Sequence, residues 1–181
     1  MYCEAMRASE FDILFVPDRG GVPADHWQSR WGARLSSARF VETPDGNMGP
    51  RAVVEAAALA RRPVLFIAHS RGAVAVAQAA AELRPFDVRG AFLVAPPSEK
   101  VLATLDEGRW APIPRERLPW PTLLAASRTD PWAPLEESRA LAESWGAEFV
   151  DAGETGRIDV ESDHGPWPDG LLKLAGLLKR L

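Results

Sequence analysis

Short continuous apolar runs alternate along the chain with longer segments in which apolar residues recur every three or four positions. Runs of the first kind are typical of buried parallel strands, and segments of the second kind are typical of helices that cover a sheet. The apolar runs predict strands over residues 11–16, 63–68, 88–95, 121–126 and 148–151. The pattern therefore predicts an α/β fold, a three-layer sandwich with a mainly parallel central sheet and helices on both faces.

The amphipathic segments between these runs predict the helices. They cover about residues 25–37, 50–60, 73–83, 135–145 and 169–180. Asp25 is a plausible N-cap for the first of them. In the last, one stripe of leucines is expected to be buried, namely Leu171, Leu174, Leu177 and Leu178. Residues 98–119 contain many prolines and charges, which predicts a short helix and an irregular cap over the edge of the sheet.

The chain has the size and composition of one domain. Of its 181 residues, 46% are hydrophobic, which is enough for a core of ordinary size. We expect a flexible tail over residues 1–10 and a single domain over 11–181, because no repeat or linker interrupts the pattern. The lone Cys3 lies in the tail, and we expect no role for it.

Charge and apolar run length exclude several functions. With 21 basic and 25 acidic residues the net charge is -4, which argues against a nucleic-acid-binding protein. No apolar run approaches the roughly 20 residues of a membrane span, and the first residues do not resemble a signal peptide. We therefore expect a cytoplasmic protein that does not contact a membrane. No Cys/His cluster suggests a metal, and no cofactor is expected.

The sharpest chemical signal is the segment Ala68-His69-Ser70-Arg71-Gly72, between a predicted strand and a predicted helix. A nucleophile elbow needs this context, and it needs small residues two positions before and after the serine because the backbones approach closely. Ala68 and Gly72 meet that need. The other interpretation is a serine that merely caps the helix. We favour the elbow.

Five segments together resemble the YdeN-like small serine hydrolases, which have a short form of the α/β-hydrolase fold. They are DHWQSRW at 25–31, AHSRG at 68–72, LVAPP at 93–97, SRTDPW at 127–132 and GPWPDG at 165–170. The resemblance covers nearly all of residues 11–181. It implies that Ser70 is the nucleophile and that Asp130 orients a catalytic histidine.

The histidine of that family does not map onto a histidine here. Where relatives resemble Gly-His-Ile-Asn, this chain reads Gly156-Arg157-Ile158-Asp159. Arginine stays protonated and offers donors only, so Arg157 cannot accept the proton of a serine hydroxyl. The resemblance therefore implies a non-standard triad.

His164, which follows in the same loop, is the candidate displaced base. Two other interpretations remain open, in which His164 is a substrate ligand or a surface residue of the loop. His69 and His26 are expected to be structural.

Three arginines fall on loops at the carboxyl ends of predicted strands, where ligands bind in open α/β sheets. They are Arg19, Arg71 and Arg157, with Asp18 beside the first. The backbone N–H groups of Arg71 and Arg19 are the candidate oxyanion donors. The side chains of the three arginines, with Asp18, are expected to bind a small-molecule substrate that has an anionic group. The alternative is that the arginines pair with aspartates of the chain, of which Asp18, Asp130, Asp159 and Asp163 are candidates.

Three classes of function remain open. The first is hydrolysis or acyl transfer on a small ester or thioester through Ser70. The second is a lyase or cyclase of secondary metabolism, for example one that eliminates an acyloxy group, whose departing carboxylate suits an arginine pocket. The third is a catalytically inactive ligand-binding protein. For all three, the pocket mouth is expected at Ser70, Asp130 and the loop 153–164, partly covered by residues 98–119.

Overall fold

A computed structural model describes residues 7–43, 46, 48–105 and 111–181. Cys3 and part of the predicted cap at 98–119 lie outside the described residues. Residues 8–10 were expected to belong to a flexible tail, but they form a short 3-10 helix, η1 (Ala8–Glu10). The carbonyl oxygen of Ala8 accepts a hydrogen bond from the Ser37 hydroxyl, which ties this turn to the domain.

The core of the molecule is one sheet of six strands in the order β2-β1-β3-β4-β5-β6, and every neighbouring pair is parallel. The strands are β1 (Asp12–Val16), β2 (Ala38–Phe40), β3 (Val64–His69), β4 (Val88–Val94), β5 (Thr122–Ala126) and β6 (Glu148–Asp151). β3 lies in the interior of the sheet and is buried along its whole length. The predicted α/β class and parallel sheet are confirmed.

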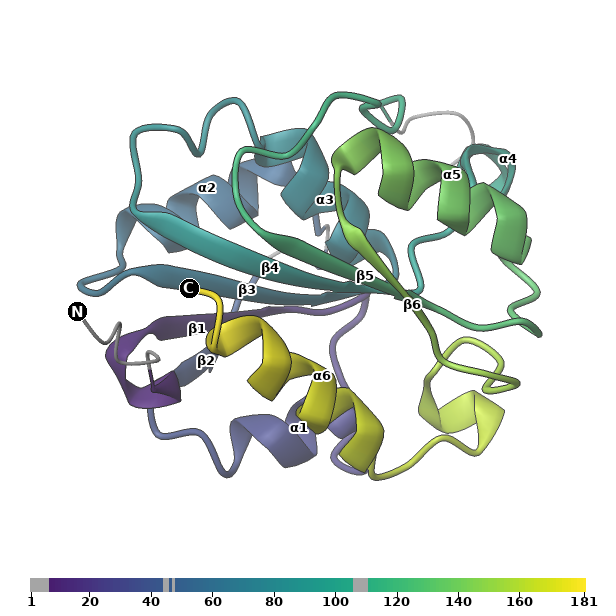
Figure 1. Ribbon diagram of the computed structural model, residues 1–181, viewed down its shortest axis with the longest axis horizontal. Helices are drawn as coiled ribbons and strands as arrows, with labels where there is room; N and C mark the ends of the chain where they lie inside the picture. The colour runs from purple at the N-terminus through teal and green to yellow at the C-terminus, as the bar shows by residue number, and fades with distance from the viewer. Residues whose placement is uncertain (1–6, 44–45, 47, 106–110) are drawn as a thin grey trace.

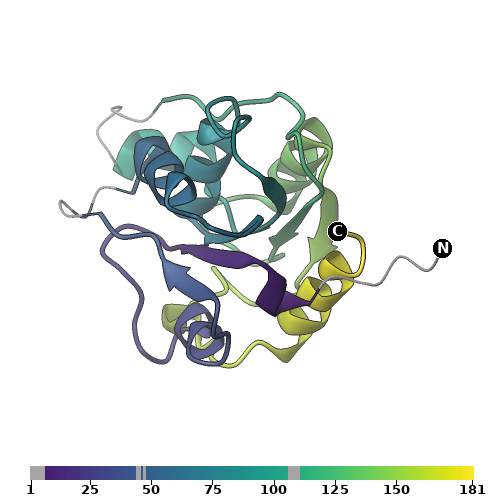
Figure 2. The ribbon, with the colours of Figure 1, turned by 90° about the vertical axis from the view of Figure 1, so that its left-hand side faces the viewer.

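Helices cover both faces of this sheet, as Figure 1 shows. The helices are α1 (Trp27–Gly32), α2 (Pro50–Ala58), α3 (Arg71–Ala79), α4 (Glu99–Leu105), α5 (Leu135–Trp145) and α6 (Pro168–Leu178). α2, α3, α4 and α5 lie on one face, and α1 and α6 lie on the other. Figure 2 shows the sheet from the side, between the two helical layers. Each layer buries its own apolar cluster against the sheet.

The first helix differs from the prediction. α1 spans Trp27–Gly32, which is shorter than the expected 25–37, and its N-cap is His26 and not Asp25. The His26 Nδ1 atom accepts the backbone N–H of Gln28 at 3.2 Å, so the imidazole performs the capping that we had assigned to a carboxylate. The strand β2 was not predicted, because its three residues have only intermediate or exposed side chains.

The leucine stripe of α6 is narrower than expected. Leu174 and Leu177 are buried, whereas Leu171 is 38% exposed. The helix packs Gly170 against the ring of Trp167, so the buried face is set by Trp167 and the two inner leucines. No helix among the described residues is long and apolar enough to cross a membrane.

Candidate active site

Ser70 occupies a strained turn between β3 and α3. Its backbone has φ 54° and ψ -124°, a conformation that residues other than glycine rarely adopt. Its side chain makes no capping hydrogen bond to the helix, so the interpretation as a plain helix cap is wrong. The geometry is that of the predicted elbow.

The glycine after the elbow explains how the turn fits. A Cβ atom on Gly72 would lie 2.3 Å from the carbonyl oxygen of Val16 and 2.5 Å from that of Pro17. Only a residue without a side chain therefore allows α3 to begin so close to the end of β1. This contact places Ser70 next to the loop that follows β1.

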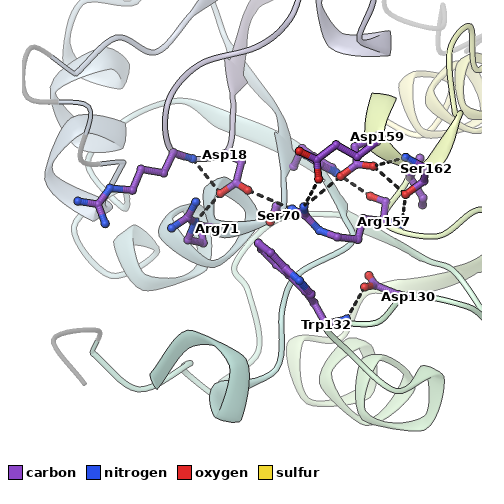
Figure 3. A network of polar contacts seen from close by, with 12 residues as sticks. Asp18, Ser70, Arg71, Asp130, Trp132, Arg157, Asp159 and Ser162 are labelled. Atoms are coloured by element: carbon purple, nitrogen blue, oxygen red, sulfur yellow. Dashed lines mark hydrogen bonds and ion pairs between the residues drawn. The ribbon is translucent and has the colours of Figure 1, made fainter. Parts of the chain in front are cut away.

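Arg157 contacts the Ser70 hydroxyl. Its Nη2 atom is 3.3 Å from Ser70 Oγ and 3.1 Å from Asp18 Oδ2, and its Nη1 atom is 3.1 Å from Asp159 Oδ2. The guanidinium carbon lies 3.4 Å from the centre of the Trp132 ring. With only 14% of its side chain exposed, Arg157 is held on several sides (Figure 3). The group at the serine is therefore a cation that donates hydrogen bonds.

Asp18 links the loop after β1 to both arginines of the site. Its Oδ1 atom accepts hydrogen bonds from Arg71 Nε at 2.5 Å and from the backbone N–H of Arg19 at 2.8 Å. Burial alone would raise the pKa of Asp18, but the hydrogen bond and charge of Arg71, with the Arg19 N–H, hold this pKa below its usual value. The Arg19 N–H, a candidate oxyanion donor, is thus engaged by Asp18. Arg71 is the first residue of α3, so its own N–H has no acceptor within the helix.

Asp130 lies after β5, and its Oδ1 atom accepts the backbone N–H of Trp132 at 2.8 Å. Burial raises the pKa of Asp130 to about 6, although the Trp132 N–H and the charge of Arg157 act in the opposite direction. Within the described residues Asp130 makes no ion pair and no hydrogen bond to a histidine. It is therefore an acid without the partner that the resemblance implies.

The structure does not bring His164 to Ser70. The His164 ring packs against the Trp167 ring at a centroid distance of 5.8 Å, and its buried Nε2 atom has no hydrogen-bond partner among the described residues. Burial lowers the pKa of His164. The contact with Trp167 gives no support to the interpretation of His164 as the base for Ser70.

His69 contacts the backbone of Arg157. Burial lowers the pKa of His69, and its Nε2 atom is 2.9 Å from the carbonyl oxygen of Arg157. Because that oxygen can only accept, the Nε2–H donates. His69 therefore positions the Arg157 backbone, in agreement with the structural role that we expected.

Asp159, Trp132 and Ser162 belong to the site, although the sequence did not indicate a site role for them. Asp159 Oδ1 accepts the Ser162 hydroxyl at 2.7 Å, and Ser162 Oγ accepts the Arg157 N–H at 3.0 Å. Asp159 had been considered only as a pairing partner for the arginines. Its place two residues after Arg157 was the available signal, and Trp132 was part of the quoted SRTDPW segment.

A cavity of about 1040 Å³ lies beside the site, between the loop after β1, β2 and α2. Asp18 lines this cavity, whereas Ser70, Asp130 and the loop 153–164 do not. This cavity is therefore a different one from the pocket mouth expected at Ser70, Asp130 and the loop 153–164. Ser70 itself is 1% exposed.

No metal site accompanies these groups in the part of the chain that the structure describes, because no three His, Cys, Asp or Glu side chains are arranged to hold an ion.

Comparisons with known structures agree with this architecture. A YdeN-like hydrolase from Pectobacterium atrosepticum is 28% identical, with a TM-score of 0.83 over 94% of this chain and 92% of its own. The ydeN gene product from B. subtilis is 17% identical, with a TM-score of 0.71 over 92% of this chain and 98% of its own. RedJ, a thioesterase from the prodiginine biosynthetic pathway in Streptomyces coelicolor, is 19% identical, with a TM-score of 0.66 over 97% and 95%.

No curated protein matches the chain in sequence. The model of the serine hydrolase family, in contrast, matches residues 13–176, which include the elbow, Arg71, Arg157 and Asp130. The chain therefore belongs to the serine hydrolase family and is an enzyme of the α/β-hydrolase superfamily.

Proposed function

We propose that this enzyme cleaves or transfers the acyl group of a small ester or thioester at Ser70, with Arg157 in the position where relatives have the catalytic histidine. One observation carries the proposal: the hydroxyl of a serine in an elbow conformation, φ 54°, receives a hydrogen bond from Arg157 Nη2 at 3.3 Å. The Arg71 N–H at the start of α3 is well placed to stabilise an oxyanion formed beside Ser70.

Arg157 then acts by charge. A guanidinium beside Oγ stabilises negative charge on the serine oxygen or on a substrate oxygen bound next to it, but it cannot remove a proton. We assign proton uptake to Asp130 instead of His164, because Asp130 follows β5 at the same edge of the sheet as Ser70 and feels the charge of Arg157, which contacts the Ser70 hydroxyl. Burial raises the pKa of Asp130 to about 6. A carboxylate with this pKa is ionised at neutral pH and is a stronger base than an ordinary aspartate.

An elimination is the second candidate reaction, because the Ser70 hydroxyl contacts a cation and not a base. In an elimination, Asp130 would take a proton from the carbon next to the one that bears the acyloxy group. The carbon–oxygen bond would break, an alkene would form, and the carboxylate would leave toward Arg157 and Ser70. This lyase reaction needs no nucleophilic serine.

Turnover of a β-acyloxy ketone in water enriched in oxygen-18 distinguishes the two reactions. Hydrolysis through an acyl-enzyme puts one heavy oxygen into the released acid, and Ser70→Ala abolishes it. Elimination releases an unlabelled acid and an alkene. Ser36→Ala, at an exposed serine outside the site, is the matched control. We expect labelled acid from the wild type, and unlabelled acid with alkene would favour the lyase. Equal turnover in wild type and Ser70→Ala would contradict an acyl-enzyme.

A further inference from the structure

The carboxylate of Asp18 lies where three hydrogen-bond donors converge. It receives Arg71 Nε at 2.5 Å, Arg157 Nη2 at 3.1 Å and the backbone N–H of Arg19 at 2.8 Å. The side chains of Arg71 and Arg157 are only 11% and 14% exposed, and that of Asp18 is 17% exposed. Two guanidinium groups and an N–H around one carboxylate form an anion site that is shielded from water, where such contacts are strong.

We infer that Arg71 and Arg157 form a binding site for the carboxylate of a small apolar ligand, and that Asp18 occupies this site until the ligand carboxylate replaces it. The inference deepens the proposed function, and rests on it only in taking the ligand to be the substrate or the product acid. Arg157 Nη2 contacts both Asp18 Oδ2 and Ser70 Oγ. A carboxylate bound in place of Asp18 would therefore contact the same Arg157 nitrogen that contacts the serine oxygen.

The loop that carries Asp18 has room for the exchange. Gly20 and Gly21 have φ values of 89° and 93°, and no atom lies within 4 Å of the position of a Cβ on either residue. Asp18 also lines the cavity of about 1040 Å³, which offers space for its displaced side chain and a path for the ligand.

The same cavity indicates the rest of the ligand. Its wall includes Val41 and Met48, which are 4% and 6% exposed, together with Phe40, Ala52 and Ala56. A carboxylate anchored on the arginines can extend an alkyl chain or an aromatic ring along this wall. The ligand class is therefore a monocarboxylate with an apolar chain or ring.

Binding of unreactive carboxylates tests the inference without turnover. Asp18→Ala removes the internal carboxylate and leaves both arginines in place. We expect acetate to raise the Tm of Asp18→Ala saturably, with an affinity at least tenfold higher than for the wild type by calorimetry. Phenylacetate should bind this variant at least tenfold more tightly than acetate, because its ring reaches the apolar wall. Chloride at equal ionic strength should have no such effect.

Two further variants locate the site. Asp87→Ala removes an exposed aspartate that pairs with Arg89, so it loses a carboxylate on the surface and should not respond to acetate. Adding Arg71→Gln to Asp18→Ala should abolish acetate binding. If Asp18→Ala does not fold, Asp18→Asn is measured in the same way, because the amide keeps the size of the side chain without its charge.

Equal acetate affinity of the wild type and both Asp18 variants would overturn the inference, as would an equal response of Asp87→Ala. The carboxylate site and the proposed acyl-transfer reaction can each be contradicted without the other. Ser70-dependent ester turnover without acetate binding contradicts only the carboxylate site. Acetate binding without any Ser70-dependent turnover contradicts only the acyl-transfer reaction.

Discussion

At Ser70 the hydroxyl contacts a cation that the chain itself neutralises. Arg157 pairs with Asp18 and Asp159, and Arg71 pairs with Asp18. The arginines therefore pair with aspartates of the chain, as the alternative interpretation expected. Their partners are Asp18 and Asp159, and not Asp130. The pairs are largely buried, so removal of one member leaves an uncompensated charge beside the serine. Any anionic ligand must compete with these carboxylates.

The residues of the site could be named from the sequence, but their contacts could not. Ser70 was recognisable because an elbow constrains its near neighbours, which are adjacent in the chain. Asp18 and Arg157 are 139 positions apart, and their ion pair exists only because β1 and β6 end at the same edge of the sheet. The expected approach of His164 to Ser70 was a statement about loop shape, which local spacing does not determine.

Asp130 should make the activity and the stability depend on pH in opposite directions. Its folded pKa of about 6 lies above the ordinary aspartate pKa of 3.8, so its contribution to stability is full below pH 3.8 and is lost as the pH rises through about 6. Above that pH, Asp130→Asn should be more stable than the wild type by about 2 kcal/mol, a gain that disappears near pH 4. Urea unfolding at several pH values measures this difference.

The same substitution should remove the base. Wild-type turnover should rise with pH through about 6 as Asp130 ionises. Turnover by Asp130→Asn should be lower by about 100-fold or more and should lack this rise. A variant with wild-type turnover and an unchanged pH profile would show that Asp130 does not take up the proton.

Among the elements, those with continuous apolar character were predicted closely, and those set by tertiary contacts were not. β3 and β5 follow their apolar runs within one residue of the expected bounds. β2 was missed because Ala38–Phe40 pairs only with β1 at the edge of the sheet, and its short run has no buried residue. α1 ends early, at Gly32, where a Cβ would be 3.0 Å from the Phe40 ring.

The close contact of α3 with the end of β1 is what fixes the elbow, and Gly72→Ala tests it. The added methyl would overlap the Val16 carbonyl at 2.3 Å, so the helix start must move. We expect a loss of about 1–3 kcal/mol in the free energy of unfolding, together with loss of Ser70 reactivity.

Gly176→Ala is the control for Gly72→Ala, because Gly176 is also helical but has no atom within 4 Å of its Cβ position. Alanine there should raise the free energy of unfolding by up to about 1 kcal/mol. Thermal and urea unfolding should therefore shift in opposite directions for the two variants. A Gly72→Ala protein as stable as the wild type would mean that the close approach does not constrain the turn.

For the whole molecule, the sheet explains why one edge collects the chemistry. All six strands are parallel, so their carboxyl ends and the loops that follow them meet on the same side. Asp18 follows β1, Ser70 follows β3, and Arg157 follows β6 (Figure 3). The sequence predicted this edge because the strand pattern was clear. It did not predict the cavity beside β2, since that cavity depends on a strand which the pattern left out.

Two features are central to the proposed chemistry: Ser70 is the reacting residue, and Arg157 stands where relatives have a base. The rate of Ser70 labelling by a fluorophosphonate, followed by intact-protein mass spectrometry, tests both in one assay. We expect slow labelling of the wild type, none of Ser70→Ala, and labelling of Arg157→His at least tenfold faster, because an imidazole can accept the serine proton. A gain below threefold in a folded Arg157→His protein, or labelling that survives Ser70→Ala, would contradict the account.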